Sequence, residues 1–426
     1  GTAYVSGGDF RFLQIVFGYL VARLIISAVF MPWYFRGELV TVYQLLRERF
    51  GAPVRGLAAT LFVVMRTIAD GVRLLLTGLV VAAVFKSIGA DTALDATVIG
   101  LGVVMIVFTL IGGIQAIVWI EVVQLLIYIG GAIAAAVILM QHVGAGEAIA
   151  LAASYDKFRV FDFALDFTKT YGFWSGLIGG TFLTLSTHGT DQYMVQRYLC
   201  TDRPRKAATA LLASGVIVLV QFVGFLFIGV LLFAFYRPDR LPAYAKLGSA
   251  APFTAADQVF PDFITTQLPA GLSGLVVAAI LAAAMSSSLS AIASTVVSDL
   301  YQPLAKQRDD RHYLRVSRAV VIVAGLAQIA VGIALQTQQR SAVNAVLSVA
   351  SLINGPILGV FFLGMLKRGR TTAALAGMTV GLATVLYIAF ATKVAWPWFA
   401  VVGSLVTVMV GLLVSAFENN ELRTQI

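Results

Sequence analysis

The sequence predicts an all-α integral membrane protein with about eleven transmembrane helices. Of its 426 residues, 59% are hydrophobic and 12% are charged, a balance that soluble domains of this length do not have. Runs of about 20 mostly apolar residues, the length that crosses the hydrocarbon core of a bilayer, recur from end to end. The connections between these runs alternate between basic and acid-rich, as positive-inside topology requires.

The predicted spans follow one another closely along the chain. In order they lie near 13–35, 54–86, 97–117, 119–141, 172–190, 206–235, 270–299, 315–336, 343–365, 371–391 and 397–417. Two connections, 142–171 and 236–269, are long enough for short amphipathic helices. The opening segment, GTAYVSGGDF at 1–10, is too short and glycine-rich to span, so we expect it to be the outer end of a helix whose membrane portion is missing.

Basic residues gather in every second connection. These connections hold Arg36, Arg47, Arg49 and Arg55; Arg197, Arg203, Arg205 and Lys206; Lys306, Arg308, Arg311 and Arg315; and Lys367, Arg368 and Arg370. The positive-inside rule places this set in the cytoplasm, which puts residues 1–10 outside and the C-terminal tail inside. We therefore expect a multi-pass protein of the plasma (inner) membrane. The net charge of +9 is explained by these basic loops and does not indicate nucleic-acid binding.

Several classes of function lack their sequence signatures. The single cysteine, Cys200, excludes an intramolecular disulfide framework, and the three histidines have no metal-site spacing. No nucleophile with a partner base, phosphate-binding glycine loop or haem ligation pattern is present. The sequence therefore predicts that the protein is not an enzyme.

The helix predicted at 281–301, LAAAMSSSLSAIASTVVSDLY, combines small residues with hydroxyls. Ser287, Ser290, Ser294 and Ser298 fall at helical spacings and share one face. Two interpretations are open at this point. The small residues could serve close helix packing, with each hydroxyl bonded to its own helix. Alternatively, the hydroxyls could present oxygen ligands to a dehydrated hard cation such as sodium.

The second predicted span contains three charged residues on one helical face, Arg66, Asp70 and Arg73. At about 1.5 Å per residue from Val54, Arg66 lies about 18 Å into the span, near the middle of the membrane. Charges at this depth face a cavity or partner charges. The cluster is either an internally paired structural element or a substrate-binding or gating group.

Further candidates lie at the ends and breaks of other spans. Glu121, about one turn into its span, is either an interfacial acid or the charge that balances a bound cation. Asp191 and Arg197 could form an inner gate pair. Asn354 precedes Gly355 and Pro356, where a proline frees a backbone carbonyl, either at a binding site or at a simple kink.

Six strings together resemble the sodium/solute symporter family, which includes sodium/glucose, sodium/proline and sodium/sialic-acid cotransporters. They are FRGELVTVYQLLRERFG at 35–51, GGIQAIVWIEVVQ at 112–124, GTDQYMVQRYL at 189–199, LPAGLSGLVVAAILAAAMSS at 268–287, GPILGVFFLGMLKRG at 355–369 and WPWFAVVGS at 396–404. The resemblance implies a leucine-transporter-like fold of two inverted repeats in one domain, 1–426. The first repeat would continue over 1–141, the second would occupy 172–365, and 371–417 would form peripheral helices.

The resemblance also implies ion sites. The carbonyl of Ala283 and the hydroxyls of Ser286 and Ser287 match the main sodium site of the family. Glu121 stands where relatives have an aspartate linked to a second sodium, and Ser290 is the companion of that acid. The first core helix of the family, which supplies the other half of the sodium shell, is represented only by its outer end.

The function implied is sodium-coupled symport of a small organic solute by alternating access, with sodium as the coupling ion and the bilayer and the solute as partners. Two alternatives are a sensory module, which would need a long extension after Ile426, and a non-transporting fragment. The sequence names neither the solute nor the oligomeric state.

Overall fold

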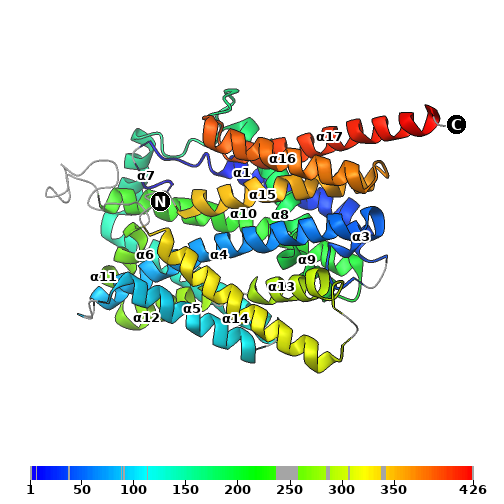
Figure 1. Cartoon of the computed structure of the whole chain (residues 1–426). Coiled ribbons are helices and arrows are strands. Elements are labelled where there is room, and N and C mark those ends of the chain that lie inside the picture. The colour runs from blue at the N-terminus through cyan, green and yellow to red at the C-terminus, as the bar shows by residue number, and fades with distance from the viewer. Residues whose placement is uncertain are drawn as a thin grey trace.

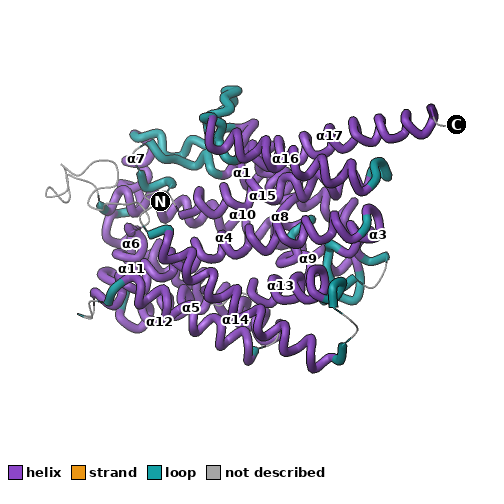
Figure 2. The backbone as a smooth tube through the Cα atoms, in the orientation of Figure 1, coloured by secondary structure: helices purple, strands orange, loops and turns teal. Residues whose placement is uncertain are grey.

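The computed structural model describes residues 2–5, 7–36, 39–87, 89, 92–112, 114–236, 258–284, 288–305, 308–336 and 342–424. Across these residues the chain is helical with loops between the helices, and no strand is present (Figure 2). The long helices lie side by side in one bundle (Figure 1). This agrees with the all-α architecture that the sequence predicts.

In the described part of the chain, three π-helical turns (η) accompany the α-helices. The first half of the chain forms α1 (Leu13–Ile25), η1 (Ile26–Phe30), α2 (Met31–Tyr34), α3 (Gln44–Phe50), α4 (Ala52–Ser87), α5 (Leu94–Ile111), α6 (Ile114–Val143) and α7 (Ala145–Ser154). The second half forms η2 (Ser175–Gly179), α8 (Gly180–Gly189), α9 (Gln192–Leu199), α10 (Pro204–Phe235), α11 (Val259–Gln267), α12 (Ala270–Ala284), α13 (Ser288–Thr295), η5 (Val296–Tyr301), α14 (Asp310–Ala334), α15 (Ala342–Met365), α16 (Thr371–Ala391) and α17 (Pro397–Thr424).

Eight helices in the described part of the chain are long and apolar enough to cross a membrane. They are Leu13–Tyr34, Leu94–Ile111, Trp119–Val143, Pro204–Phe235, Asp310–Ala334, Val346–Met365, Thr371–Ala391 and Pro397–Glu418, and each overlaps a predicted span. The other three predicted spans lie on α4, on η2 with α8, and on α12 with α13, which are not among the eight. The count of eleven therefore stays a prediction.

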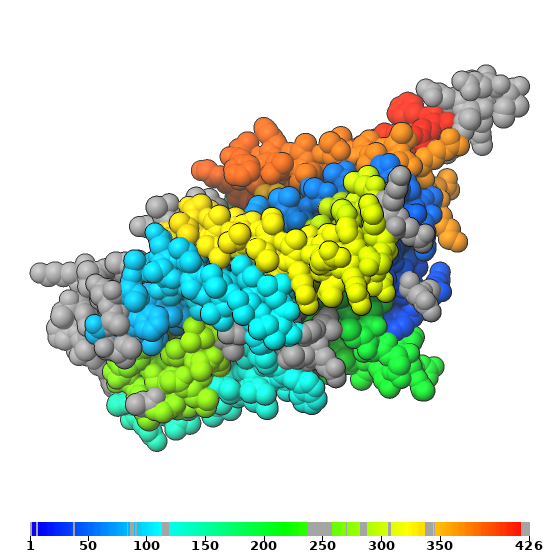
Figure 3. Space-filling view, turned by 60° about the horizontal axis from the view of Figure 1, so that its bottom comes forward, coloured from blue at the N-terminus to red at the C-terminus, as the bar shows by residue number. Residues whose placement is uncertain are grey.

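The short helices mark the two ends of the bundle. α7 and α11, from the long connections predicted to lie outside, are at one end in Figure 1, and α3 and α9, from basic connections, are at the other. Between the ends, the outer surface is apolar. Figure 3 shows α14 and α5 side by side on one face, where Val323 and Val107 are among the exposed aliphatic side chains.

Helix α1 packs against η2 and α8 at backbone contact. A Cβ atom on Gly18 would lie 2.5 Å from the carbonyl oxygen of Gly176, and one on Gly180 would lie 2.6 Å from that of Ile15. Small residues permit this approach, which membrane helices use where two backbones must meet. The contact fixes α1 beside the segment that leads into α9.

Helix α15 is continuous across Pro356, so the sequence Asn354-Gly355-Pro356 does not interrupt it. Gly355 packs on α17, where an added Cβ would lie 2.9 Å from the Cα atom of Ala400. Ser351 also bonds to this helix region, since its hydroxyl donates to the Trp396 carbonyl at 2.9 Å and accepts from the Ala400 amide at 3.0 Å. The proline region therefore serves helix packing here.

The connection 142–171 ties down the start of the chain. The Lys157 amino group donates to the carbonyl oxygens of Val5 at 2.6 Å and of Ala3 at 3.2 Å, and burial lowers its pKa to about 8. Asp162 pairs with Lys169 at 3.1 Å and with Arg11 at 3.4 Å. The hydrogen bond from Lys169 holds the pKa of Asp162 below its usual value.

Candidate functional site

The middle of α4 carries the charged residues that the sequence places on one helical face. The Nε atom of Arg66 lies 2.9 Å from Oδ2 of Asp70, and a terminal nitrogen of Arg73 pairs with the other oxygen of the same carboxylate. The Asp70 side chain is only 4% exposed. One buried carboxylate is thus held between two arginines, an arrangement that offsets the cost of a charge in a low-dielectric interior.

Helix α9 brings a second acid to this cluster. Asp191 begins the helix as its N-cap, because its carboxylate accepts a hydrogen bond from the Tyr193 amide at 2.8 Å. Its other oxygen lies 3.7 Å from Nη1 of Arg66, and the Arg66 guanidinium stacks on the Tyr193 ring at 3.9 Å from the centroid. Arg66 therefore joins α4 to α9 through an ion pair and a cation–π contact.

Arg197 continues the chain of contacts to α6. Its guanidinium lies 4.3 Å from the Tyr193 ring centroid and donates to the tyrosine hydroxyl at 3.0 Å. The same nitrogen donates to Oε1 of Glu121 at 2.6 Å. Tyr193 thus has two guanidinium groups against one ring. Arg197 pairs with Glu121 from α6, whereas the sequence suggested Asp191 as its gate partner.

We call these residues the inner charge network. It contains the cations Arg66, Arg73 and Arg197, the anions Asp70, Glu121 and Asp191, and the ring of Tyr193. Three positive and three negative charges give a net charge of zero. Side-chain exposure rises from 2% at Asp191 to 33% at Arg73, so the network is closed at its centre and open at its edge.

Tyr193 is the functional residue that sequence reasoning missed. Its position two residues after Asp191 shows that it belongs to the first turn of the same helix. Its stacking with side chains from another helix depends on how α4 and α9 cross, which no local pattern states. Tyr193 lies in the string 189–199, which resembles the family. That resemblance was the sequence feature that could have pointed to this residue.

The four ion ligands predicted within 281–301 divide between described residues and residues outside the described part of the chain. Ser286 and Ser287 lie outside the described residues, between the end of α12 and the start of α13. Ala283 is in the last turn of α12, and Ser290 is in the first turn of α13. The sodium ligands that the sequence predicts on this helix therefore stay a prediction.

A second buried ionic cluster joins the end of η5 to the start of α4. Asp299 accepts a hydrogen bond from the Thr41 hydroxyl at 2.9 Å and lies 3.8 Å from Nε of Arg55. The side chains of Asp299 and Arg55 are 0% and 3% exposed. Arg55 was grouped with the residues of a basic connection, but the fold buries it against this acid. Asn354 is also buried, in α15, and its described contacts do not join it to the inner charge network.

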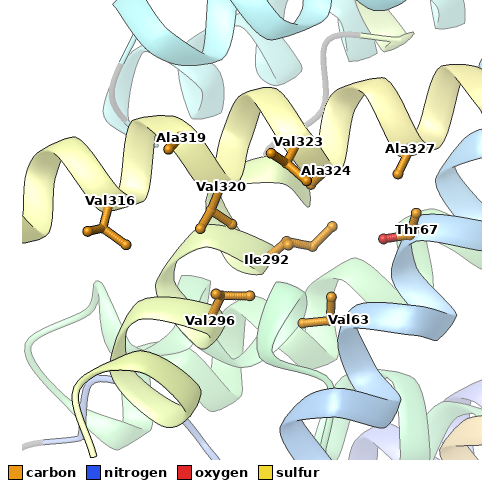
Figure 4. Close-up of a pocket in the computed structure, with 10 residues that line it drawn as sticks. All are labelled: Val63, Thr67, Ile292, Val296, Val316, Ala319, Val320, Val323, Ala324 and Ala327. Carbon is orange, nitrogen blue, oxygen red and sulfur yellow. The ribbon is translucent and has the colours of Figure 1, made fainter. Parts of the chain in front are cut away.

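A pocket of about 420 Å³ lies between α4, α13, η5 and α14 (Figure 4). Val63, Ile292 and Val320 point into it, and Thr67 provides the single hydroxyl among the residues that line it. A hydrocarbon lining suits neither a dehydrated cation nor a charged solute. The inner charge network, in contrast, offers buried charged groups.

A helical bundle with apolar spans and a buried ionic network of zero net charge is typical of a polytopic membrane transport protein. The model of the sodium:solute symporter family matches residues 1–381, and the chain belongs to this family. The resemblance found in the sequence is thereby confirmed. The protein is a sodium-coupled symporter and not an enzyme.

Curated relatives of this chain carry different solutes. It is 31% identical to the sodium/sialic acid symporter NanT of Aliivibrio fischeri, over 98% of this chain and 82% of the relative. It is 29% identical to the sodium/sialic acid symporter SiaT of Proteus mirabilis, over 96% and 82%. It is 30% identical to the human sodium/iodide cotransporter, over 89% of this chain and 58% of the relative.

Solved structures agree with the fold. A Na+-coupled sialic acid symporter in a substrate-bound, outward-open state superposes with a TM-score of 0.84 at 25% identity, covering 98% of this chain and 85% of the other. Mhp1, a nucleobase-cation-symport-1 family transporter in a closed conformation, superposes with a TM-score of 0.60 at 13% identity, covering 96% and 88%. The second likeness concerns the fold alone.

Proposed function

We propose that this symporter carries a small anionic solute inward with sodium. Three kinds of relative, named for sialic acid, iodide and monocarboxylates, carry anions. We further propose about eleven spanning helices, two inverted repeats (1–141 and 172–365) with peripheral helices at 371–417, and a cytoplasmic C-terminus in the plasma (inner) membrane. The alternation of basic and acid-rich connections supports this orientation.

The exposure of the Arg73 side chain is the observation that supports an anionic solute. Its side chain is 33% exposed, compared with 11% for Arg66 and 22% for Arg197, so it has free surface for a ligand. An arginine can hold a carboxylate through two parallel hydrogen bonds. Asp70 already engages Arg73 from one side, which orients the guanidinium and leaves its remaining donors available.

The inner charge network has the form of a gate. It links α4, α6 and α9 through Arg66, Asp191, Arg197 and Glu121, with Tyr193 between the two arginines. In alternating access one group of helices rocks against another around a fixed site. We propose that these ion pairs hold the inner side closed and separate when the protein opens to the cytoplasm. Asn354 on α15 is retained as a further gating candidate.

For the coupling ion we propose the Ala283 carbonyl and the hydroxyls of Ser286 and Ser287 as ligands, the positions that match the main sodium site of the family. Hard cations bind oxygen ligands of this kind. A second sodium would use Glu121 and Ser290. Because Glu121 already pairs with Arg197, sodium would compete with the guanidinium for this carboxylate, which would couple ion binding to the gate.

The solute class is tested by uptake into proteoliposomes under an inward sodium gradient. We expect a sialic acid, a short monocarboxylate or iodide to accumulate, and a neutral sugar and proline to be excluded. Arg73→Gln should raise KM for the transported anion about tenfold and leave the maximal rate nearly unchanged, as loss of one charged contact would. Arg203→Gln, at a 75% exposed side chain, is the matched control. Accumulation of the neutral solutes alone, or an unchanged KM in Arg73→Gln, would refute the proposal.

A second prediction concerns Glu121. We expect Glu121→Gln to raise the half-saturating sodium concentration for uptake at least threefold, because it removes the charge that balances the cation. The melting temperature should change little, since the ion pair with Arg197 is partly exposed and such pairs contribute about 1 kcal/mol or less. Asp202→Asn, at an exposed acid paired with Lys206, is the control. Identical sodium titrations in Glu121→Gln and the parent would exclude this role.

A further inference from the structure

Arg23 is a buried arginine at the midpoint of the 22-residue span Leu13–Tyr34. The residue is 4% exposed, and its Nε and Nη1 atoms are buried without a hydrogen-bond partner in the described part of the chain. Its aliphatic stem passes Gly215 of α10, where an added Cβ would lie 3.0 Å from the arginine Cδ atom. The glycine therefore makes room for the side chain between α1 and α10.

Two further buried hydroxyls near Arg23 have no partner among the described residues. Ser27 lies four residues further along, on the same side of the helix, and its Oγ atom is buried without a partner among the described residues. The Tyr198 hydroxyl, from α9, is also buried without a hydrogen-bond partner among the described residues, and it lies within electrostatic range of Arg23. Arg23 of α1, Ser27 of η1 and Tyr198 of α9 are thus three neighbouring hydrogen-bond donors, each with a buried atom that lacks a described partner.

The charge of Arg23 has no described counter-ion. An arginine keeps its proton in a protein interior, and an unpaired charge in a span requires a partner or water. The acids of the inner charge network are each paired with Arg66, Arg73 or Arg197, and Asp299 is paired with Arg55. Among the described residues, the negative charge that would match Arg23 is therefore not supplied by this chain.

The local backbone also changes at this point. The α-helix gives way to the π-helical turn η1 at Ile26–Phe30, which begins less than one turn after Arg23, and such turns inside helices frequently occur at functional sites. His188, at the end of α8, lies within electrostatic range of Arg23 and has its Nδ1 atom 3.1 Å from the Thr187 hydroxyl.

We propose that Arg23, Ser27 and Tyr198 form a binding site for a small monovalent anion. The guanidinium supplies the charge and two donors, and the two hydroxyls supply further donors, whereas no carboxylate of the described residues opposes the ligand. The site draws on α1, η1 and α9, with Gly215 of α10 beside it, and it uses none of the residues proposed to bind the solute or sodium. A bound anion would neutralise the membrane-embedded arginine and stabilise the packing of α1.

The test is direct binding of ³⁶Cl⁻ to the purified full chain at constant sodium and ionic strength. We expect saturable binding that formate displaces and gluconate, a bulkier anion, does not. Arg23→Gln should abolish it, and Tyr198→Phe and Ser27→Ala, which keep the charge, should weaken it about tenfold, as expected for a hydrogen bond to a charged group. Arg203→Gln, at an exposed arginine, should bind like the parent.

The comparison of anions identifies the source of the ligand. Displacement of ³⁶Cl⁻ by the transported solute at its KM would assign the same site to the carboxylate or halide of the solute, whereas lack of displacement would assign it to inorganic anion. Either result supports an anion site at Arg23. Absence of saturable binding in the folded parent, or equal binding in folded Tyr198→Phe, Ser27→Ala and parent, would overturn the proposal. Because the assay measures binding, its outcome is independent of whether uptake selects anions.

Discussion

Arg66→Ala is expected to abolish uptake and to destabilise the protein by about 3–5 kcal/mol, the cost of leaving one member of a buried ion pair without its partner. Asp70 would keep Arg73, but Asp191 would lose the guanidinium 3.7 Å away in a site where its side chain is 2% exposed. Tyr193 would lose one of its two cation contacts. Melting temperature and sodium-driven uptake should therefore fall together.

The double variant Arg66→Ala with Asp191→Asn separates charge pairing from packing. Asparagine can still accept the hydrogen bond from the Tyr193 amide that begins α9, so the cap is retained while the unpaired charge is removed. We expect the double variant to recover most of the lost stability but not transport, because the contact between α4 and α9 stays broken. A double variant as unstable as Arg66→Ala would show that the ion pair is not what Arg66 contributes.

The part of this site that the sequence could predict is the part on one helix. Arg66, Asp70 and Arg73 are three and four residues apart, and helical spacing alone puts them on one face. Their mid-membrane depth follows from counting residues along α4. The contacts with Tyr193 and Glu121 depend on how α4, α6 and α9 cross, and the pairing of Arg197 with Glu121 joins residues 76 positions apart.

Burial of charged residues near the ends of spans was harder to predict. Arg55 stands among other basic residues in the sequence, and positive-inside logic treats all of them as solvated. Only the fold shows that Asp299, 244 positions later, meets it in a buried cluster with Thr41. Arg23 has no local signal except its presence in an apolar span, and its lack of a partner becomes visible only when α9 and α10 are placed beside it.

The small residues of the helix predicted at 281–301 suggest close helix packing there, whereas a close backbone approach that the structure describes lies elsewhere, between α1 and η2. Gly176 would place a Cβ atom 2.6 Å from the carbonyl carbon of Gln14. Isolated glycines in apolar segments occur throughout this chain, so the sequence gives no means of selecting those that meet another backbone. Their role depends on the contact and not on the residue type.

Gly176→Ala is therefore expected to destabilise the protein by about 3 kcal/mol, the upper end of the range for overpacking, because the added methyl meets backbone that cannot rotate away. Displacing α1 would also break the hydrogen bonds of the buried Gln14 side chain, which accepts from the Asp162 amide at 3.0 Å and donates to the Tyr171 carbonyl at 3.3 Å.

Gly224→Ala is the matched control, because its Cβ would have no neighbour within 4 Å. In the middle of α10 this change should be neutral or stabilising by up to about 1 kcal/mol. Melting temperature and uptake should fall in Gly176→Ala alone, and equal behaviour of the two variants would contradict the close approach of α1 to η2.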